Sequence, residues 1–250
     1  MARLSVNLNK IALLRNSRRT GVPDVLHFGR IAHDAGADGL TVHPRPDERH
    51  IRRDDVFGLA ELMRPWRPAF ELNIEGYPDS RFLDLVRQIV PEQCTLVPDA
   101  PDVLTSEEGW KLIPEERRQV DPVIAALKGI GCRVILFVDP DAATVDRVHD
   151  TAADGIEIYT GSYAAAFRAG NPEPLLQACA ATATRAAELG LVVNIGHDLN
   201  LDNLPLLTAA LPAIAEASIG HELTADALIT GFAAAVRAYK AALSGRTTTA

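Results

Sequence analysis

Residues 41–50 read TVHPRPDERH, so that two histidines, two arginines and two acids follow directly on an apolar run. Histidine and carboxylate side chains exchange protons near neutral pH, and arginine binds phosphate or carboxylate groups. A solvated loop could hold the same residues. The segment alone therefore indicates either a surface loop or the mouth of an active site.

The same arrangement recurs along the chain and favours a site. Four of the seven histidines come at or just beyond the ends of apolar runs: His43, His50, His197 and His221. Two carboxylates, Glu71 and Glu157, lie inside such runs, where burial is costly unless the group is paired or protonated. We predict acid–base catalysis by His43, His197, Glu71 and Glu157. The alternative for each carboxylate is a structural role beside a neighbouring arginine.

A second set of residues could bind phosphate. Arg18 and Arg45 can bind an anion, and the NIGH and SIGH endings place a glycine where backbone N–H groups can approach one. ELTADA, residues 222–227, would form the short helix beyond Gly220 and His221. The alternative is that these glycines only permit tight turns. Thr105 opens TSEE, a capping box that explains a threonine there without any ligand.

The elements that must position these residues alternate along the chain. Eight β-rich runs with near-continuous apolar interiors are each followed by a longer segment or helical pattern, which predicts a (β/α)8 TIM barrel. A doubly wound open sheet is the alternative, but the first loop lacks GxGxxG. We expect one domain over residues 1–243, one helix over 224–243, loops over 105–116 and 160–173, and a disordered tail over 244–250. The strands are expected at 4–9, 39–44, 69–75, 94–99, 133–140, 155–161, 191–197 and 216–221.

Composition and motifs exclude several classes of function. The net charge is -8 with no long basic stretch, which argues against nucleic-acid binding, and no apolar run or leader indicates a membrane or export. The three cysteines, without a CxxC pair, are expected reduced in a cytoplasmic protein. The first strand has no His-x-His for a metal, and only Lys10 lies near a strand end as a Schiff-base lysine. Cofactor-free acid–base chemistry on a phosphorylated carbonyl compound is favoured.

These motifs resemble those of the pyridoxine 5′-phosphate synthase family. The resemblance rests on VNLNKIALLRNSR, DAGADGLTVHPRPDERHI, FEL, TLVPD, GIEIYTGSYA, LVVNIGHDLN and SIGHEL, in order from about residue 4 to about 240. It implies a (β/α)8 barrel that assembles as a homo-octamer. It also implies condensation of 3-amino-2-oxopropyl phosphate with 1-deoxy-D-xylulose 5-phosphate to pyridoxine 5′-phosphate, phosphate and water, without a metal or organic cofactor.

The resemblance also implies roles for individual residues. His43 and Glu71 match proton acceptors, His197 a proton donor, and Glu157 a carboxylate close to the catalytic histidine. Deoxyxylulose phosphate would contact Arg45, His50 and Thr105, and the aminoketone phosphate would contact Asn7, Arg18, Asp198, Gly220 and His221. Asn9 and Lys10 stand where the family most often has Asp-His, Asp198 where Gly is usual, and Tyr159 where His is frequent. A phosphosugar aldolase or isomerase using Lys10 is the alternative function.

Overall fold

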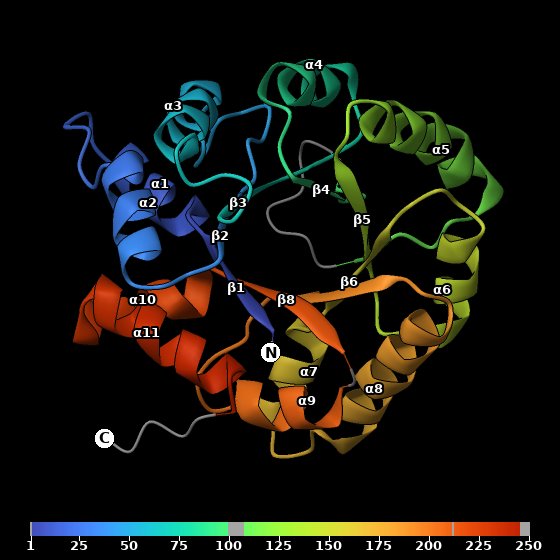
Figure 1. The fold of residues 1–250 in the computed structure, drawn as a ribbon. Coiled ribbons are helices and arrows are strands. Elements are labelled where there is room, and N and C mark those ends of the chain that lie inside the picture. The colour runs from blue at the N-terminus through green and yellow to red at the C-terminus, as the bar shows by residue number, and fades with distance from the viewer. Residues whose placement is uncertain (1, 100–107, 212, 246–250) are drawn as a thin grey trace.

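Eight parallel strands close into a barrel in sequence order, and a ring of helices surrounds them (Figure 1). The computed structural model describes residues 2–99, 108–211 and 213–245. The predicted (β/α)8 fold is confirmed, with strands that are mostly shorter than expected. Their bounds are β1 Arg3–Asn7, β2 Gly39–Val42, β3 Glu71–Gly76, β4 Gln93–Leu96, β5 Arg133–Val138, β6 Gly155–Tyr159, β7 Val192–Gly196 and β8 Ile214–Ile219.

The helices match the expected segments at most places. They are α1 Asn9–Asn16, α2 Val25–Asp34, α3 Arg53–Met63, α4 Ser80–Ile89, α5 Pro114–Gly129, α6 Ala142–His149, α7 Gly161–Arg168, α8 Glu173–Glu188, α9 Leu204–Ala210, α10 His221–Thr230 and α11 Phe232–Leu243. Two of these helices, α1 and α7, were not expected. Each begins within two residues of a strand end, so no turn signal marks its start.

Two other expectations about the helices need correction. The loop expected at 160–173 is mostly α7, with α8 beginning at its end. The single helix expected at 224–243 is two helices, because Gly231 between them adopts a φ of 86°, which an α-helix cannot contain. Of the loop expected at 105–116, residues 105–107 lie outside the described residues, 108–113 contain no helix or strand, and 114–116 are the first turn of α5. Residues 246–250 of the expected tail also lie outside the described residues.

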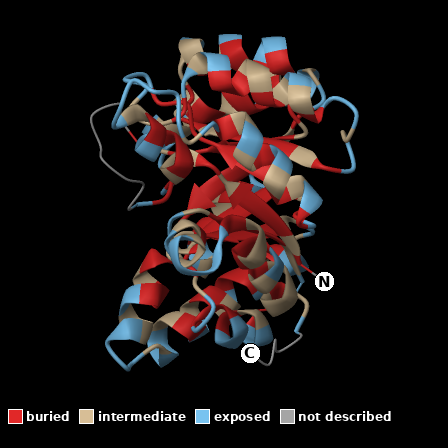
Figure 2. Ribbon diagram, turned by 90° about the vertical axis from the view of Figure 1, so that its left-hand side faces the viewer, coloured by how far each residue is buried: buried red, intermediate tan, exposed pale blue. Residues whose placement is uncertain are grey.

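Several strands alternate in polarity, whereas β5 is apolar from Val134 to Val138. Successive side chains of a strand point to opposite faces. On β3, for example, Leu72 and Ile74 belong to the apolar core, while the side chain of Asn73 contacts other polar side chains. On β6 the buried Glu157 likewise lies between Ile156 and Ile158, whereas β5 has apolar side chains on both faces. Figure 2 shows the strands as the buried centre of the molecule. The barrel interior is therefore rich in polar groups.

Several polar side chains inside the barrel hydrogen-bond to one another across neighbouring strands. Ser5 and Thr41 hydroxyls lie 2.6 Å apart, and Thr95 Oγ1 donates to Asn73 Oδ1 at 3.2 Å. Such mutual bonds offset the cost of burying polar side chains. On the outer face, α4 contributes Phe82, Leu85, Val86 and Ile89 to the core, and its N-cap Asp79 accepts from Phe82 N.

Two observations complete the description of the fold. No helix in the described ranges is long and apolar enough to cross a membrane. Cys94, Cys132 and Cys179 are buried and free, as expected for core cysteines. The fold thus supplies a rigid barrel whose strand ends can carry a site.

Candidate active site

A cavity of about 340 Å³ opens at the carboxyl ends of the strands. Most of the residues predicted from the sequence line it, and so do three that were not predicted, Glu75, Tyr159 and Ser218. The predicted residues that line it are Asn7, Asn9, Lys10, His43, Arg45, His50, Glu157, His197, Asp198, Gly220 and His221. Of the others, Thr105 lies outside the described residues, and Glu71 and Arg18 are not among the lining residues.

His43 and Glu75 form the centre of the cavity wall. Asn9 Oδ1 accepts a hydrogen bond from the backbone N–H of His43 at 2.9 Å, and His43 Nδ1 lies 3.9 Å from Glu75 Oε2. Burial holds the pKa of His43 well below its usual value, with Arg45 adding to the effect. Burial also raises the pKa of Glu75 to about 7. Near neutral pH the site therefore holds a neutral imidazole beside a carboxyl group close to its titration midpoint.

Glu157 lies at the centre of β6 and is buried. Burial, with Glu75 and Glu216 adding their negative charge, raises its pKa well above the usual value, against an opposing hydrogen bond from Thr95. A Cβ atom on Gly196 would lie 2.2 Å from Glu157 Oε1, so the facing strand needs a glycine there. The raised pKa favours the protonated form of Glu157, the form in which a carboxyl group can act as an acid.

His197 is held in an unusual backbone conformation just beyond β7. His197 and Asp198 have φ angles of 81° and 56°, in the region that favours glycine. The Thr160 hydroxyl lies 2.6 Å from the carbonyl oxygens of both Gly196 and His197. Asn203 Nδ2 donates to the carbonyl of Asp198 at 3.0 Å. Strain that surrounding bonds maintain in this way is typical of functional positions.

The imidazole of His197 lies against aromatic rings. Its centroid is 5.3 Å from that of Tyr159, edge to face, and 5.5 Å from that of Phe137. Burial lowers the pKa of His197, although the nearby carboxylates Asp198 and Asp99 oppose the shift. Gly161 leaves room for the tyrosine, since a Cβ there would lie 2.4 Å from the Tyr159 hydroxyl. The second histidine of the site is thus also neutral near pH 7.

The cationic side of the cavity is formed by the segment after β2. Arg45 is buried and pairs with Asp99 at 2.8 Å. His50 Nδ1 accepts from the backbone N–H of Ile51 at 2.9 Å, and burial, with Arg45 and Lys10 next, lowers the pKa of His50 to about 4. Neutral His50 therefore carries its proton on Nε2. A substrate anion would meet hydrogen-bond donors here, and the pairing of Asp99 with Arg45 reduces the repulsion from that carboxylate.

This segment is held in place by α1. Arg15, at the buried end of α1, pairs with Asp55 at 2.8 Å and donates to the carbonyl of His50 at 3.1 Å. Asn16 Nδ2 lies within hydrogen-bond distance of the carbonyls of residues 48, 49 and 50. The unpredicted helix α1 is thus the element that fixes His50.

The opposite wall of the cavity offers backbone donors. Helix α10 begins at His221, with Gly220 as its N-cap, and the first turn of a helix has free N–H groups and a positive potential. A Cβ on Gly220 would lie 2.9 Å from Cβ of Asn7, so only glycine allows β1 this close. The carboxylate of Asp198 is 4.0 Å from Arg168, which reduces its repulsion of an anion.

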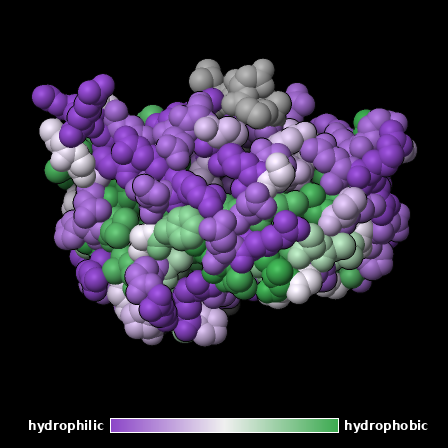
Figure 3. Space-filling model, turned by 90° about the horizontal axis from the view of Figure 1, so that it is seen from above, coloured by the Kyte–Doolittle hydropathy of each residue, from purple (hydrophilic) through white to green (hydrophobic). Residues whose placement is uncertain are grey.

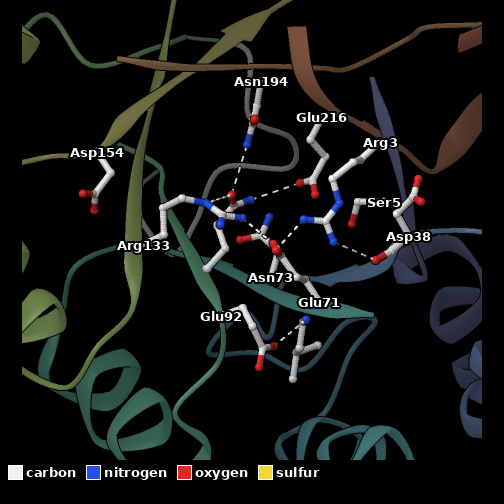
Figure 4. A network of polar contacts seen from close by, with 12 residues as sticks. Arg3, Ser5, Asp38, Glu71, Asn73, Glu92, Arg133, Asp154, Asn194 and Glu216 are labelled. Atoms are coloured by element: carbon white, nitrogen blue, oxygen red, sulfur yellow. Dashed lines mark hydrogen bonds and ion pairs between the residues drawn. The ribbon is translucent and has the colours of Figure 1, made fainter. Parts of the chain in front are cut away.

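Glu71 lies at the start of β3, at the amino end of the barrel, where the structure gives it a different environment. It pairs with both Arg3 and Arg133 (Figure 4). Burial tends to raise its pKa, but the hydrogen bonds from the two arginines outweigh this and lower it. The expected position of Glu71 at the site is therefore corrected: it is an ionised carboxylate paired with arginines, the structural alternative. Arg18 is exposed beyond the end of α1.

A barrel of this kind, with neutral histidines, carboxyl groups of raised pKa and anion-binding elements at its strand ends, is typical of acid–base enzymes that handle phosphorylated substrates. The chain matches the family model described as "Pyridoxal phosphate biosynthesis protein PdxJ" over residues 4–245. It belongs to this family.

Known proteins agree with this assignment. The chain is 49% identical over 249 residues to a pyridoxine 5′-phosphate synthase of Brucella suis, covering 98% of this chain and 99% of the relative. It is 48% identical over 242 residues to the enzyme of that name from Albidiferax ferrireducens, with 95% of each covered. A tryptophan synthase structure from M. tuberculosis superposes with a TM-score of 0.61 at 15% identity, covering 97% of this chain and 93% of that one. This last likeness shows the barrel fold alone.

Proposed function

We propose that this chain is a pyridoxine 5′-phosphate synthase. It would condense 3-amino-2-oxopropyl phosphate with 1-deoxy-D-xylulose 5-phosphate and release phosphate and water. The observation that carries the proposal is the grouping of His43, Glu75, Glu157 and His197 around one cavity, two of them neutral imidazoles and two with raised carboxyl pKa values. Imine formation, elimination and ring closure each move a proton, so bases and acids on different strands can serve them in turn.

The residue roles follow from these positions. His43 and Glu75 take up protons, Glu75 replacing the Glu71 that the sequence suggested, because Glu75 is the carboxyl group of β3 beside His43. His197 protonates the leaving oxygen, and Glu157 acts as the neighbouring acid. Deoxyxylulose phosphate binds on the cationic side, and the aminoketone phosphate binds at the start of α10. The reaction needs no metal or organic cofactor.

We further propose that the protein is a cytoplasmic homo-oligomer, an octamer by its resemblance to the family. Large apolar side chains are exposed on two helices that contact each other: Leu13 (43%) and Leu14 (52%) on α1, and Leu228 (79%) and Ile229 (87%) on α10. Exposed apolar groups of this size are typical of contact surfaces between subunits. Light scattering of Leu228→Lys with Ile229→Lys should show smaller particles than the unchanged chain; equal mass would rule out this surface.

The first test is incubation of the purified protein with both phosphorylated substrates. Pyridoxine 5′-phosphate, followed by absorbance, and free phosphate should appear in equal amounts. Folded protein that forms neither product would contradict the proposal. The aldolase alternative also has a specific observation in its favour, because Lys10 lines the cavity. It predicts that borohydride with one substrate attaches that substrate covalently to Lys10, and an unmodified Lys10 would exclude it.

A further inference from the structure

A second group of arginines lies outside the cavity, in a shallow groove between α3 and α4. The groove is lined by Arg53 of α3 and by Arg81, Asp84, Arg87 and Gln88 of α4. Figure 3, which views the molecule from the side where α4 lies in Figure 1, shows a face with many hydrophilic side chains. Three positive charges and one negative charge line this groove.

The carboxylates nearby neutralise little of this charge. Arg87 lies 3.7 Å from Asp84, and both side chains are more than half exposed, so water weakens the pair. Within the described part of the chain, no carboxylate lies at ion-pair distance from the guanidinium group of Arg53 or Arg81, although the Glu48 carboxylate accepts from the backbone N–H of Arg53 at 3.0 Å. Arg53 lies over the ring of Phe57, 5.2 Å from its centroid. Arg81 Nε is buried and has no hydrogen-bond partner among the described residues. Leaving a buried N–H unpaired costs free energy, and a small rotation of the Arg81 side chain towards an anion in the groove would satisfy it.

Arg81 also connects the groove to the active site. Its Nη2 donates to the carbonyl oxygen of Pro44 at 2.8 Å, and Pro44 stands between His43 and Arg45, both of which line the cavity. One guanidinium therefore contacts the catalytic segment through one nitrogen and has a free N–H on another. Because the guanidinium is rigid and planar, a ligand that reorients it also changes its bond to Pro44.

We propose that this groove is a second anion site, which binds an ion of the size and charge of inorganic phosphate between Arg53, Arg81 and Arg87. Through Arg81, an anion bound in the groove affects the segment that carries His43 and Arg45. The proposed anion binding depends only on the residues of the groove. The proposed effect on turnover rests on the proposed function.

The expected effect on the site is electrostatic. The groups that face His43 are Arg45 and His50 after β2, Glu75 of β3, His197 after β7 and Arg81 of α4. Burial is the largest cause of the low pKa of His43, and Arg81 is one of the charges that add to it. A bound anion offsets the charge of Arg81, so the pKa of His43 rises towards its ordinary value. Since His43 acts as a base, the acid side of the pH–rate profile moves to higher pH.

Binding is tested with inorganic phosphate followed by calorimetry. The unchanged protein should show one more phosphate site than the double variant Arg53→Gln, Arg87→Gln, and each single variant should weaken that site about tenfold or more, as expected for one charge-assisted hydrogen bond. Arg64→Gln, which removes an exposed arginine at the C-terminal end of α3, is the matched control and should bind like the unchanged chain. Equal numbers of sites and equal affinities in the unchanged protein, the two single variants, the double variant and Arg64→Gln would overturn the proposal.

Coupling is tested by the pH dependence of kcat/KM with and without phosphate. Phosphate should move the acid limb to higher pH in the unchanged protein and in Arg64→Gln, and should leave it in place in Arg81→Gln and in the double variant. A shift that survives in Arg81→Gln would overturn the coupling. Absence of turnover in every protein, with the extra phosphate site intact, would instead refute the proposed function.

Discussion

Two glutamates of one strand provide a sharp test of the acid–base assignment. Glu75 and Glu71 lie four residues apart on β3, so both side chains point into the barrel, but at opposite ends. Glu75 lines the cavity, whereas Glu71 pairs with Arg3 and Arg133. Glu75→Gln removes the ionisable group and keeps the size of the side chain. Glu71→Gln is the matched control at the far end.

We expect Glu75→Gln to lower kcat by about 10²- to 10⁴-fold, the usual contribution of a positioned acid or base, or about 3 to 5 kcal/mol of transition-state stabilisation. With a pKa of about 7, Glu75 is close to half ionised at neutral pH, so both of its protonation states are available for turnover. KM should change only a few-fold, because the donors at Gly220 and His221 are untouched.

Glu71→Gln should act on stability instead. It removes the charge that both arginines contact, and their side chains are 33% and 31% exposed, so water can take over part of the lost interaction. We expect a loss of about 1–3 kcal/mol in the free energy of unfolding in urea, with turnover within about threefold of the unchanged chain. Folded Glu75→Gln with near-normal kcat, or folded Glu71→Gln without activity, would refute the assignment.

Three further predictions concern the groups around the site. Gly196→Ala should lower kcat about 10²-fold, because its Cβ would displace the Glu157 carboxyl group 2.2 Å away; a normal rate in the folded variant would contradict this. Asn9→Ala should reduce kcat about tenfold by freeing the backbone N–H of His43, while Asn9→Asp, which keeps an acceptor, should restore it; equal rates for the two variants would refute the positioning role. Burial raises the pKa of Glu216 from 4.5 to about 7. Between these two pH values the folded protein keeps the Glu216 proton while the unfolded chain releases it. The free energy of unfolding should therefore fall as pH rises from about 4.5 to about 7. Glu216→Gln should abolish that fall in urea unfolding measured against pH, and parallel curves for both proteins would exclude it.

The barrel could be predicted from sequence because its signals are local and repeated. Each apolar run such as RVILFV, followed by a helical pattern such as that of α8, predicts one unit, and eight units predict closure. The two helices that were not predicted, α1 and α7, begin within two residues of the preceding strand, so no turn segment in the sequence separates the two elements. The split between α10 and α11 depends on one positive φ angle at Gly231, and a glycine in a helical pattern does not by itself predict it.

The site was predictable where a residue follows directly on a strand, as His43 and His197 do. Glu71 and Glu75 differ only in their place along the barrel axis, and the strand had been expected to end at residue 75. The rule that sites form at the carboxyl ends of strands already favoured Glu75. The arginines that pair with Glu71 come from β1 and β5, and no sequence spacing predicts that approach. The positive φ angles at His197 and Asp198 are likewise visible only in the folded chain.

The polar interior links the two ends of the barrel. Burial is the main cause of the raised pKa values of Glu75, Glu157 and Glu216, but each is also raised by a neighbouring carboxylate. Glu216 adds to the shifts of both Glu75 and Glu157, and Glu71 adds to that of Glu216. The arginines beside Glu71 oppose this last effect at Glu216. A like charge nearby makes a second ionisation harder, so each ionised carboxyl group along the barrel raises the pKa of its neighbours. The proton content of the active site therefore depends on Glu216 and Glu71, which are not among the residues that line the cavity.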